Sequence, residues 1–312
     1  MRAFIFPGQG SQSVGMGAAL AEASRTALDT FAEIDEALGQ NLFKLMREGP
    51  EEELRLTVNA QPAIMAQSMA VFRALTRDGG VDLAKAASVV AGHSLGEYSA
   101  LCAAGSIDLA TTAKLLKLRG ETMQAAVPVG QGAMAALLGA DLDMAKRIAN
   151  AAAEGEICTV ANDNDPGQVV ISGDKAAIDR AVAIAQGMGA KRAVLLPVSA
   201  PFHCALMQPA ADAMAEALGS VTLTAPAVPL YANVTAAPVS DPEAIIDQLV
   251  EQVTGMVRWR ESVANMASAG VEEFVELGGK VLGPMVKRTA PDAQVTSLIA
   301  IADIEAMAKE LH

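Results

Sequence analysis

Short apolar runs alternate along the chain with longer segments of helical period. The apolar runs have the length of buried strands and fall at residues 3–6, 89–91, 228–232 and 273–277. The segments of helical period fall at residues 17–37, 59–75, 108–126, 205–218, 241–252, 261–269 and 281–288. Apolar strands separated by helices are typical of a mostly parallel sheet that is covered by helices on both faces. We therefore predict an α/β fold.

The order and length of the predicted elements change between residues 128 and 200, where strands and helices become shorter. The expected order is strand 133–138, helix 142–153, strands 157–161 and 168–172, helix 176–187 and strand 193–198. This β-α-β-β-α-β order is that of a ferredoxin-like unit, which closes its own small sheet. We expect a ferredoxin-like subdomain at 128–200, inserted into a large α/β catalytic domain formed by 1–127 and 201–312. Residues 162–167 (NDNDPG) are expected to form a turn.

Composition excludes several classes of protein. The 312 residues suffice for a large core, and the net charge of −13 argues against a nucleic-acid partner. The three cysteines and three histidines show no metal-ligand spacing, so we expect no metal. The apolar start is too short for a signal peptide or a membrane helix. We expect a cytoplasmic protein without a membrane partner.

A serine lies between glycines at the end of the second predicted strand. Residues 92–96 read GHSLG, and a helical segment follows to residue 104. A G-x-S-x-G sequence between a strand and a helix is typical of a nucleophile elbow, in which glycines relieve crowding and the helix start favours an anion. The alternative is a tight turn needed only for packing. We predict a hydrolase-like core with Ser94 as the nucleophile.

A serine hydroxyl needs a base within hydrogen-bond reach, and the chain offers few candidates. His93 is adjacent to Ser94 and its side chain should diverge, while His312 is the last residue and is expected to be frayed. His203 remains as the candidate base, with a packed core histidine as the alternative. Cys204 is a rival nucleophile that nothing else in the sequence supports.

Arg119 leaves a largely apolar helix face. Because an arginine keeps its charge, its burial requires a partner for that charge. One interpretation is a substrate carboxylate, and the other is an internal salt bridge near Glu121 or to a distant aspartate. The residue pattern alone leaves both open.

Five segments together resemble the malonyl-CoA:acyl-carrier-protein transacylase family. They occur in the family's order and at similar spacing over nearly the whole chain. They are FPGQGSQ at 6–12, GHSLGEY at 92–98, Arg119-Gly120 with Met123-Gln124, SAPFH at 199–203, and Gln252 before VRW at 257–259. One departure is ELGGK at 276–280, which is one residue shorter than the usual Glu-x-Gly-Pro-Gly.

The resemblance implies a catalytic set. Ser94 would be acylated, and His203 would act as base and then as acid. The backbone carbonyl of Gln252 would orient the imidazole in place of a carboxylate. Backbone N–H groups of Gln9 and Leu95 would form the oxyanion hole, where a donor is worth about 3–4 kcal/mol.

The resemblance also implies a substrate site. Arg119 would bind the malonyl carboxylate, and Phe202 would leave little room for a 2-methyl branch. Met123 would line the pocket, although a core methionine needs no function. Asn162 would lie near the cleft, although an asparagine in a turn needs no function either.

The implied reaction is a ping-pong transfer of malonyl from malonyl-CoA to the phosphopantetheine thiol of acyl carrier protein, through a malonyl-serine. It would supply extender units for fatty acid or polyketide synthesis, with no permanent cofactor. Separately, we expect the enzyme to be a monomer. Candidate residues for carrier-protein docking are Lys114, Lys117, Lys191, Arg192, Lys287 and Arg288. The alternatives are an α/β-hydrolase esterase, an acetyl or methylmalonyl transferase, and a non-catalytic carrier-protein binder.

Overall fold

A computed structural model describes residues 1–312 and contains two separate sheets. The larger sheet has six strands in the order β10-β9-β1-β2-β7-β8. Their bounds are β1 Arg2–Phe6, β2 Val89–Gly92, β7 Leu230–Ala232, β8 Ala237–Val239, β9 Glu273–Leu277 and β10 Gln294–Leu298. All neighbours in this sheet are parallel except β7 and β8. The predicted mostly parallel sheet is confirmed.

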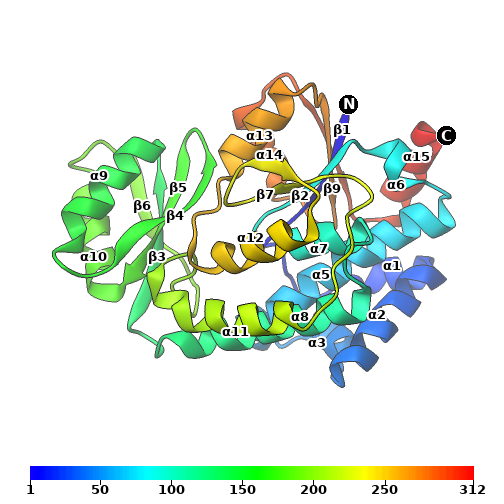
Figure 1. The fold of residues 1–312 in the computed structure, drawn as a ribbon, viewed down its shortest axis with the longest axis horizontal. Coiled ribbons are helices and arrows are strands. Elements are labelled where there is room, and N and C mark those ends of the chain that lie inside the picture. The colour runs from blue at the N-terminus through cyan, green and yellow to red at the C-terminus, as the bar shows by residue number, and fades with distance from the viewer.

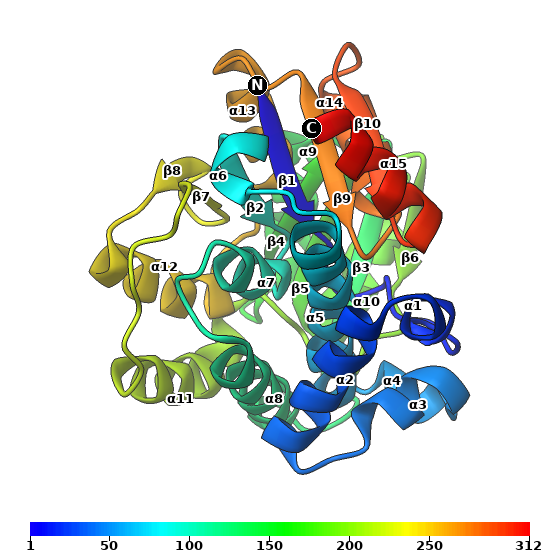
Figure 2. The same ribbon diagram turned by 90° about the vertical axis from the view of Figure 1, so that its right-hand side faces the viewer.

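Helices cover both faces of the larger sheet (Figures 1 and 2). They are α1 Ala18–Ala23, α2 Arg25–Leu38, α3 Leu42–Glu48, α4 Glu51–Arg55, α5 Thr57–Arg73, α6 Leu83–Ala86, α7 Gly96–Ala103, α8 Leu109–Ala126, α11 Gln208–Gly219, α12 Pro242–Thr254, α13 Trp259–Ser268, α14 Leu282–Thr289 and α15 Ile301–Leu311. A π-helical turn spans Ala74–Asp78 and a 3₁₀ turn spans Ala205–Met207. None of these helices combines the length and the apolarity that a bilayer-spanning segment needs.

The alternation of side chains along β1 shows why this strand is buried on both faces. Phe4 and Phe6 belong to the larger core, which includes residues of α5, α7 and α8. Ala3 and Ile5 belong to a second core, which includes Trp259 of α13 and residues of α14. Successive side chains of a strand point to opposite faces, so one apolar run supplies both cores.

The smaller sheet is antiparallel and has the order β4-β5-β3-β6. Its elements in chain order are β3 Gly132–Leu138, α9 Leu142–Ala153, β4 Cys158–Asp165, β5 Gln168–Asp174, α10 Lys175–Ala185 and β6 Arg192–Leu195. This sheet and its two helices have their own core, and they lie beside the larger sheet (Figure 1). The predicted β-α-β-β-α-β order is confirmed.

The turn expected at residues 162–167 is largely wrong. Strand β4 continues to Asp165, which leaves only residues 166–167 between β4 and β5. Residues 162–165 pair with residues 168–170 of β5, and the N–H of Asp163 also donates to the carbonyl of Val257 at 2.9 Å. The carboxylate of Asp163 also pairs with Arg260 at 2.8 Å. Pairing with β5 and contacts with a distant segment therefore together override a local sequence that favours a turn.

The C-terminal region holds more structure than the pattern predicts. Strands β8 and β10 and helix α15 are additional to the expected elements. His312, expected to be frayed, follows α15 directly, and its Nε2 lies 2.7 Å from the carbonyl oxygen of Gly79. This contact ties down the chain end.

Candidate active site

Ser94 occupies a sharp turn between β2 and α7. Its φ angle of 53° lies in the left-handed region, which is costly for a residue with a side chain. A Cβ atom on Gly92 would lie 1.9 Å from the backbone carbon of Gly96, and one on Gly96 would lie 2.2 Å from the carbonyl oxygen of Phe6. Only glycine fits at either position, so both flanking glycines serve the turn that exposes the serine.

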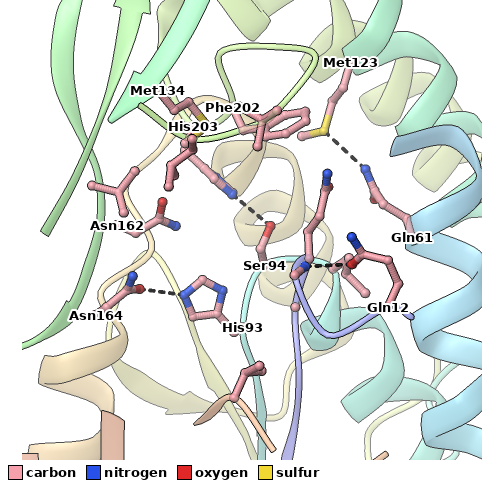
Figure 3. Close-up of a pocket in the computed structure, with 18 of the residues that line it drawn as sticks. Gln12, Gln61, His93, Ser94, Met123, Met134, Asn162, Asn164, Phe202 and His203 are labelled. Atoms are coloured by element: carbon pink, nitrogen blue, oxygen red, sulfur yellow. Dashed lines mark hydrogen bonds between the residues drawn. The ribbon is translucent and has the colours of Figure 1, made fainter. Parts of the chain in front are cut away.

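The structure brings Ser94, His203 and Gln252 into one hydrogen-bonded array (Figure 3 draws the first contact). Ser94 Oγ lies 2.8 Å from His203 Nε2, and His203 Nδ1 lies 2.8 Å from the backbone oxygen of Gln252. Because a carbonyl oxygen only accepts, Nδ1 carries the proton and Nε2 is free to accept one from the serine. This is the arrangement of a nucleophile, a base and an orienting group.

His203 is held in its neutral form. Burial and the nearby Arg119 guanidinium lower the pKa of His203 to about 3, well below the usual 6.5. A neutral imidazole at physiological pH can take the serine proton, whereas an imidazolium cannot.

A cavity of about 450 Å³ surrounds Ser94 Oγ and lies between the two sheets. The loop at residues 8–12, the elbow, residues 196–198 and the start of α14 line it. Backbone N–H groups of Gln9 and Leu95 make no hydrogen bond within the protein. Both residues line the cavity, so these unpaired donors are candidates for binding an oxyanion there.

Arg119 also lines this cavity, which it reaches from α8. The residue is nevertheless buried, with only 1% of its surface exposed. Nη1 donates to Gln61 Oε1 at 2.7 Å, and Nη2 donates to Gln252 Oε1 at 2.8 Å and to Ser94 Oγ at 3.2 Å. All its partners are neutral, and no carboxylate lies within salt-bridge distance. The internal salt bridge weighed for Arg119 is therefore wrong, and the cation is available to an anionic ligand.

The remaining residues predicted for the substrate site all line the same cavity. Phe202 and Met123 contribute to its apolar wall, and Met123 Sδ accepts from Gln61 Nε2 at 3.6 Å. Asn162 points into the cavity from β4, not from a turn (Figure 3). One cavity thus contains a nucleophile, a base, a cation and an apolar wall.

Sequence reasoning missed three polar residues around Ser94. The side chain of Asn233 accepts from the N–H of Ser94 at 2.8 Å and donates to the carbonyl of Gly92 at 2.7 Å. These two hydrogen bonds fix the backbone of the elbow. Gln61 binds Arg119, and its position in an otherwise apolar stretch of α5 was a usable signal. Glu97 is buried beside Gln252. Asn233 carries no comparable signal in the sequence.

The other candidate groups do not contact the serine hydroxyl, although His93 lines the same cavity. His93 Nε2 contacts Asn164 Oδ1 at 2.8 Å, so His93 turns away from Ser94 as expected. Cys204 Sγ donates to the carbonyl of Pro201, and burial raises the pKa of its thiol. No group of three or more His, Cys, Asp or Glu side chains is placed to hold a metal ion.

The six cations suggested for docking do not form one patch. Lys114 and Lys117 lie on α8, far from α14 in both views (Figures 1 and 2). Lys117 Nζ donates to Gln40 at 2.7 Å, and Arg288 pairs with buried Asp165 at 2.7 Å. Lys114 and the exposed pair at 191–192, next to and within β6, make no hydrogen bond or ion pair through their side chains, and Lys287 Nζ donates to the backbone carbonyl of Ala293 at 2.6 Å.

Comparisons with known proteins agree with this geometry. The family model described as acyl transferase domain matches residues 3–297. The Escherichia coli (strain K12) protein named malonyl CoA-acyl carrier protein transacylase is 48% identical over 297 residues, 95% of each chain. A solved acyl-carrier-protein-S-malonyltransferase from Bartonella henselae is 52% identical, with a TM-score of 0.97 over 99% of both chains. A solved complex of a type II PKS acyl-carrier protein with its malonyl-transacylase matches at 42% identity and a TM-score of 0.95, again over 99% of both chains. The chain therefore belongs to the acyl transferase family, among the malonyl-CoA:acyl-carrier-protein transacylases.

Proposed function

We propose that this enzyme transfers a malonyl group from malonyl-CoA to the phosphopantetheine thiol of acyl carrier protein through a malonyl-Ser94 intermediate. The observation that carries the proposal is the convergence of Ser94, His203 and Arg119 on one cavity. A nucleophile with a neutral base can form an acyl-enzyme, and a buried cation nearby selects an acyl group that ends in a carboxylate.

In the first half-reaction, His203 Nε2 takes the proton from Ser94 Oγ as that oxygen attacks the thioester carbonyl. Backbone N–H groups of Gln9 and Leu95 stabilise the oxyanion. Collapse of the tetrahedral intermediate breaks the C–S bond, and the imidazolium returns its proton to the departing CoA thiolate. Ser94 then carries the malonyl group as an ester.

In the second half-reaction, the same imidazole takes the proton from the carrier-protein thiol. The thiolate attacks the ester carbonyl, the C–O bond breaks, and the proton returns to Ser94 Oγ. The overall exchange of one thioester for another is nearly isoenergetic, so the enzyme must exclude water from the acyl-enzyme.

The backbone oxygen at His203 Nδ1 distinguishes this site from an ordinary esterase. An α/β-hydrolase places an Asp or Glu there, between the serine and the histidine in chain order. Here the partner is the carbonyl of Gln252, which follows the histidine. A non-catalytic carrier-protein binder would need neither the strained serine nor the base.

The test is an exchange assay without carrier protein. A ping-pong enzyme catalyses exchange of labelled CoA into malonyl-CoA with no acceptor present, because the first half-reaction is complete by itself. Transfer to fatty-acid and polyketide carrier proteins is then compared. Exchange that requires carrier protein would contradict the acyl-enzyme, and hydrolysis without transfer would favour an esterase.

The base itself is expected to remain active in mild acid. Burial and Arg119 lower the pKa of His203 from 6.5 to about 3, so the free base remains available at about pH 5. Below about pH 6.5 this histidine is protonated in the unfolded chain but stays neutral in the folded protein. The free energy of unfolding therefore falls as the pH drops from 6.5 towards 3. Assays in this range must be brief.

The measurement is the initial rate of CoA release from acetyl-CoA as a function of pH, analysed as kcat/KM, because acetyl-CoA has no carboxylate whose recognition could titrate with Glu97. Arg119→Gln serves as the comparison, because removing the cation is expected to move the acid limb to higher pH. An acid limb near 6.5 in the unaltered enzyme would contradict the buried neutral base.

Replacing Phe202 with alanine is expected to admit methylmalonyl-CoA. The ring forms part of the cavity wall, and its removal leaves space for a 2-methyl branch. One methyl group in an apolar pocket is worth about 10–200-fold in selectivity, so we expect a gain of at least about 10-fold in the methylmalonyl-to-malonyl ratio of kcat/KM. An unchanged ratio would show that another wall residue sets the limit.

A further inference from the structure

Glu97 is a buried carboxyl group that the proposed mechanism does not use. It lies in the first turn of α7, it is 1% exposed, and it does not line the cavity. Its Oε1 accepts from the N–H of Asn233 at 3.2 Å, and its Oε2 accepts from Gln252 Nε2. Burying a carboxyl is costly, so its position beside the active site requires an explanation.

The direction of the Gln252 amide shows what this carboxyl does. A guanidinium has only donors, so the Gln252 atom 2.8 Å from Arg119 Nη2 must be the oxygen. The amide nitrogen then faces Glu97, which must accept. Hydrogen bonds therefore run in one direction, from Arg119 through Gln252 to Glu97.

The same carboxyl contacts the elbow. Asn233, which donates to Glu97, accepts from the N–H of Ser94 at 2.8 Å. Gln252 Nε2 also donates to the carbonyl of Ser94 at 3.0 Å. One side chain thus supports both the nucleophile and the amide that contacts the cation.

We propose that Glu97 is a positioning residue for recognition of the acyl carboxylate. It keeps the Gln252 amide in the one orientation that presents an oxygen to Arg119, and so keeps Nη2 within 3.2 Å of Ser94 Oγ. This role rests on the proposed function, because it concerns the cation that binds the malonyl carboxylate.

The test is Glu97→Gln, which keeps the size of the side chain and replaces one acceptor with a donor. The N–H groups of Asn233 and Gln252 then compete for a single oxygen, and the Gln252 amide loses its fixed direction. Burial raises the pKa of Glu97 to about 8, so assays run about one pH unit above this value, where the carboxylate predominates.

The expected result is a selective loss. We expect kcat/KM for acylation by malonyl-CoA to fall about 10–100-fold, chiefly through KM, because hydrogen bonds that involve charged groups contribute about 1.5–3 kcal/mol. Acetyl-CoA has no carboxylate for Arg119 to bind, and Glu97 contacts the elbow only through Asn233 and Gln252. Acylation by acetyl-CoA should therefore change less than about 3-fold. Glu97→Asp retains two acceptors and should recover part of the malonyl preference.

Asp165→Asn is the matched control. Asp165 is also buried, at 1% exposure, but it does not line the cavity, and its carboxylate pairs with Arg288 at 2.7 Å and accepts from the N–H of Gly167 at 2.9 Å. Its replacement should lower the melting temperature and leave the malonyl-to-acetyl ratio unchanged. A melting curve for each variant separates stability from selectivity.

If Glu97→Gln lowers kcat/KM equally for malonyl-CoA and acetyl-CoA, Glu97 only supports the elbow. If kcat/KM falls for neither, Glu97 positions nothing. Either result overturns the proposal. If Glu97→Gln does not fold, the same measurement is made on Glu97→Asp. A malonyl-to-acetyl ratio of kcat/KM equal to that of the unaltered enzyme would then also overturn the proposal. An unaltered enzyme that forms no malonyl-serine would instead refute the proposed function. The two failures are therefore distinguishable.

Discussion

His203→Ala is expected to slow acylation by malonyl-CoA about 10³–10⁴-fold, with little change in binding of the thioester. The imidazole is the only base within reach of Ser94 Oγ, at 2.8 Å, and no carboxylate can replace it. Without it the serine must attack as a hydroxyl, and CoA must leave without a proton donor. The rate of acyl-enzyme formation in single-turnover experiments measures this effect.

His312→Ala is the matched control for that experiment. This histidine contacts Gly79 at the chain end and does not line the cavity, so its loss should leave the acylation rate unchanged. Added imidazole should restore part of the rate to His203→Ala, because the deleted side chain leaves space beside the serine. A His203→Ala enzyme with more than about one-tenth of the original rate would refute the assigned base, given the usual size of base catalysis.

Arg119→Ala is expected to lower kcat/KM for malonyl-CoA about 10²–10³-fold and to leave acetyl-CoA unaffected or improved, since loss of one partner from a buried charge pair costs about 3–5 kcal/mol. Arg119 is 1% exposed and its guanidinium contacts only neutral partners, so no carboxylate of the protein pairs with it directly. Acetyl groups have no carboxylate and must bury beside an unpaired cation.

Competition between the two acyl-CoAs in one reaction measures the ratio directly, with acyl-enzymes separated by mass. Arg119→Lys keeps the charge but loses the planar fork, so it should retain part of the malonyl preference. Equal losses with malonyl-CoA and acetyl-CoA would mean that Arg119 only supports the structure.

The sequence predicts the elbow well because its causes are local. A larger side chain at position 92 or 96 would clash with backbone a few residues away or in the adjacent strand. A G-x-S-x-G pattern in the sequence is typical of such a crowded turn. His203 is found by elimination, because the chain has only three histidines. The structure brings it to Ser94 from 109 residues away.

Other parts of the site have no local cause and escape sequence reasoning. The orienting group for His203 is a backbone carbonyl, and every residue has one, so only family resemblance indicates Gln252. Asn233 and Glu97 act through contacts over more than 130 residues. Strand β4 replaces an expected turn partly for the same reason, because its pairing with Val257 depends on a distant segment.

The most direct test of the account is the mass of the enzyme after incubation with malonyl-CoA in the absence of carrier protein. We expect one added malonyl group, mapped by peptide analysis to Ser94, removed by carrier protein that bears its phosphopantetheine thiol, and absent from Ser94→Ala. An adduct on another residue, such as Cys204, or no adduct despite active transfer, would contradict it.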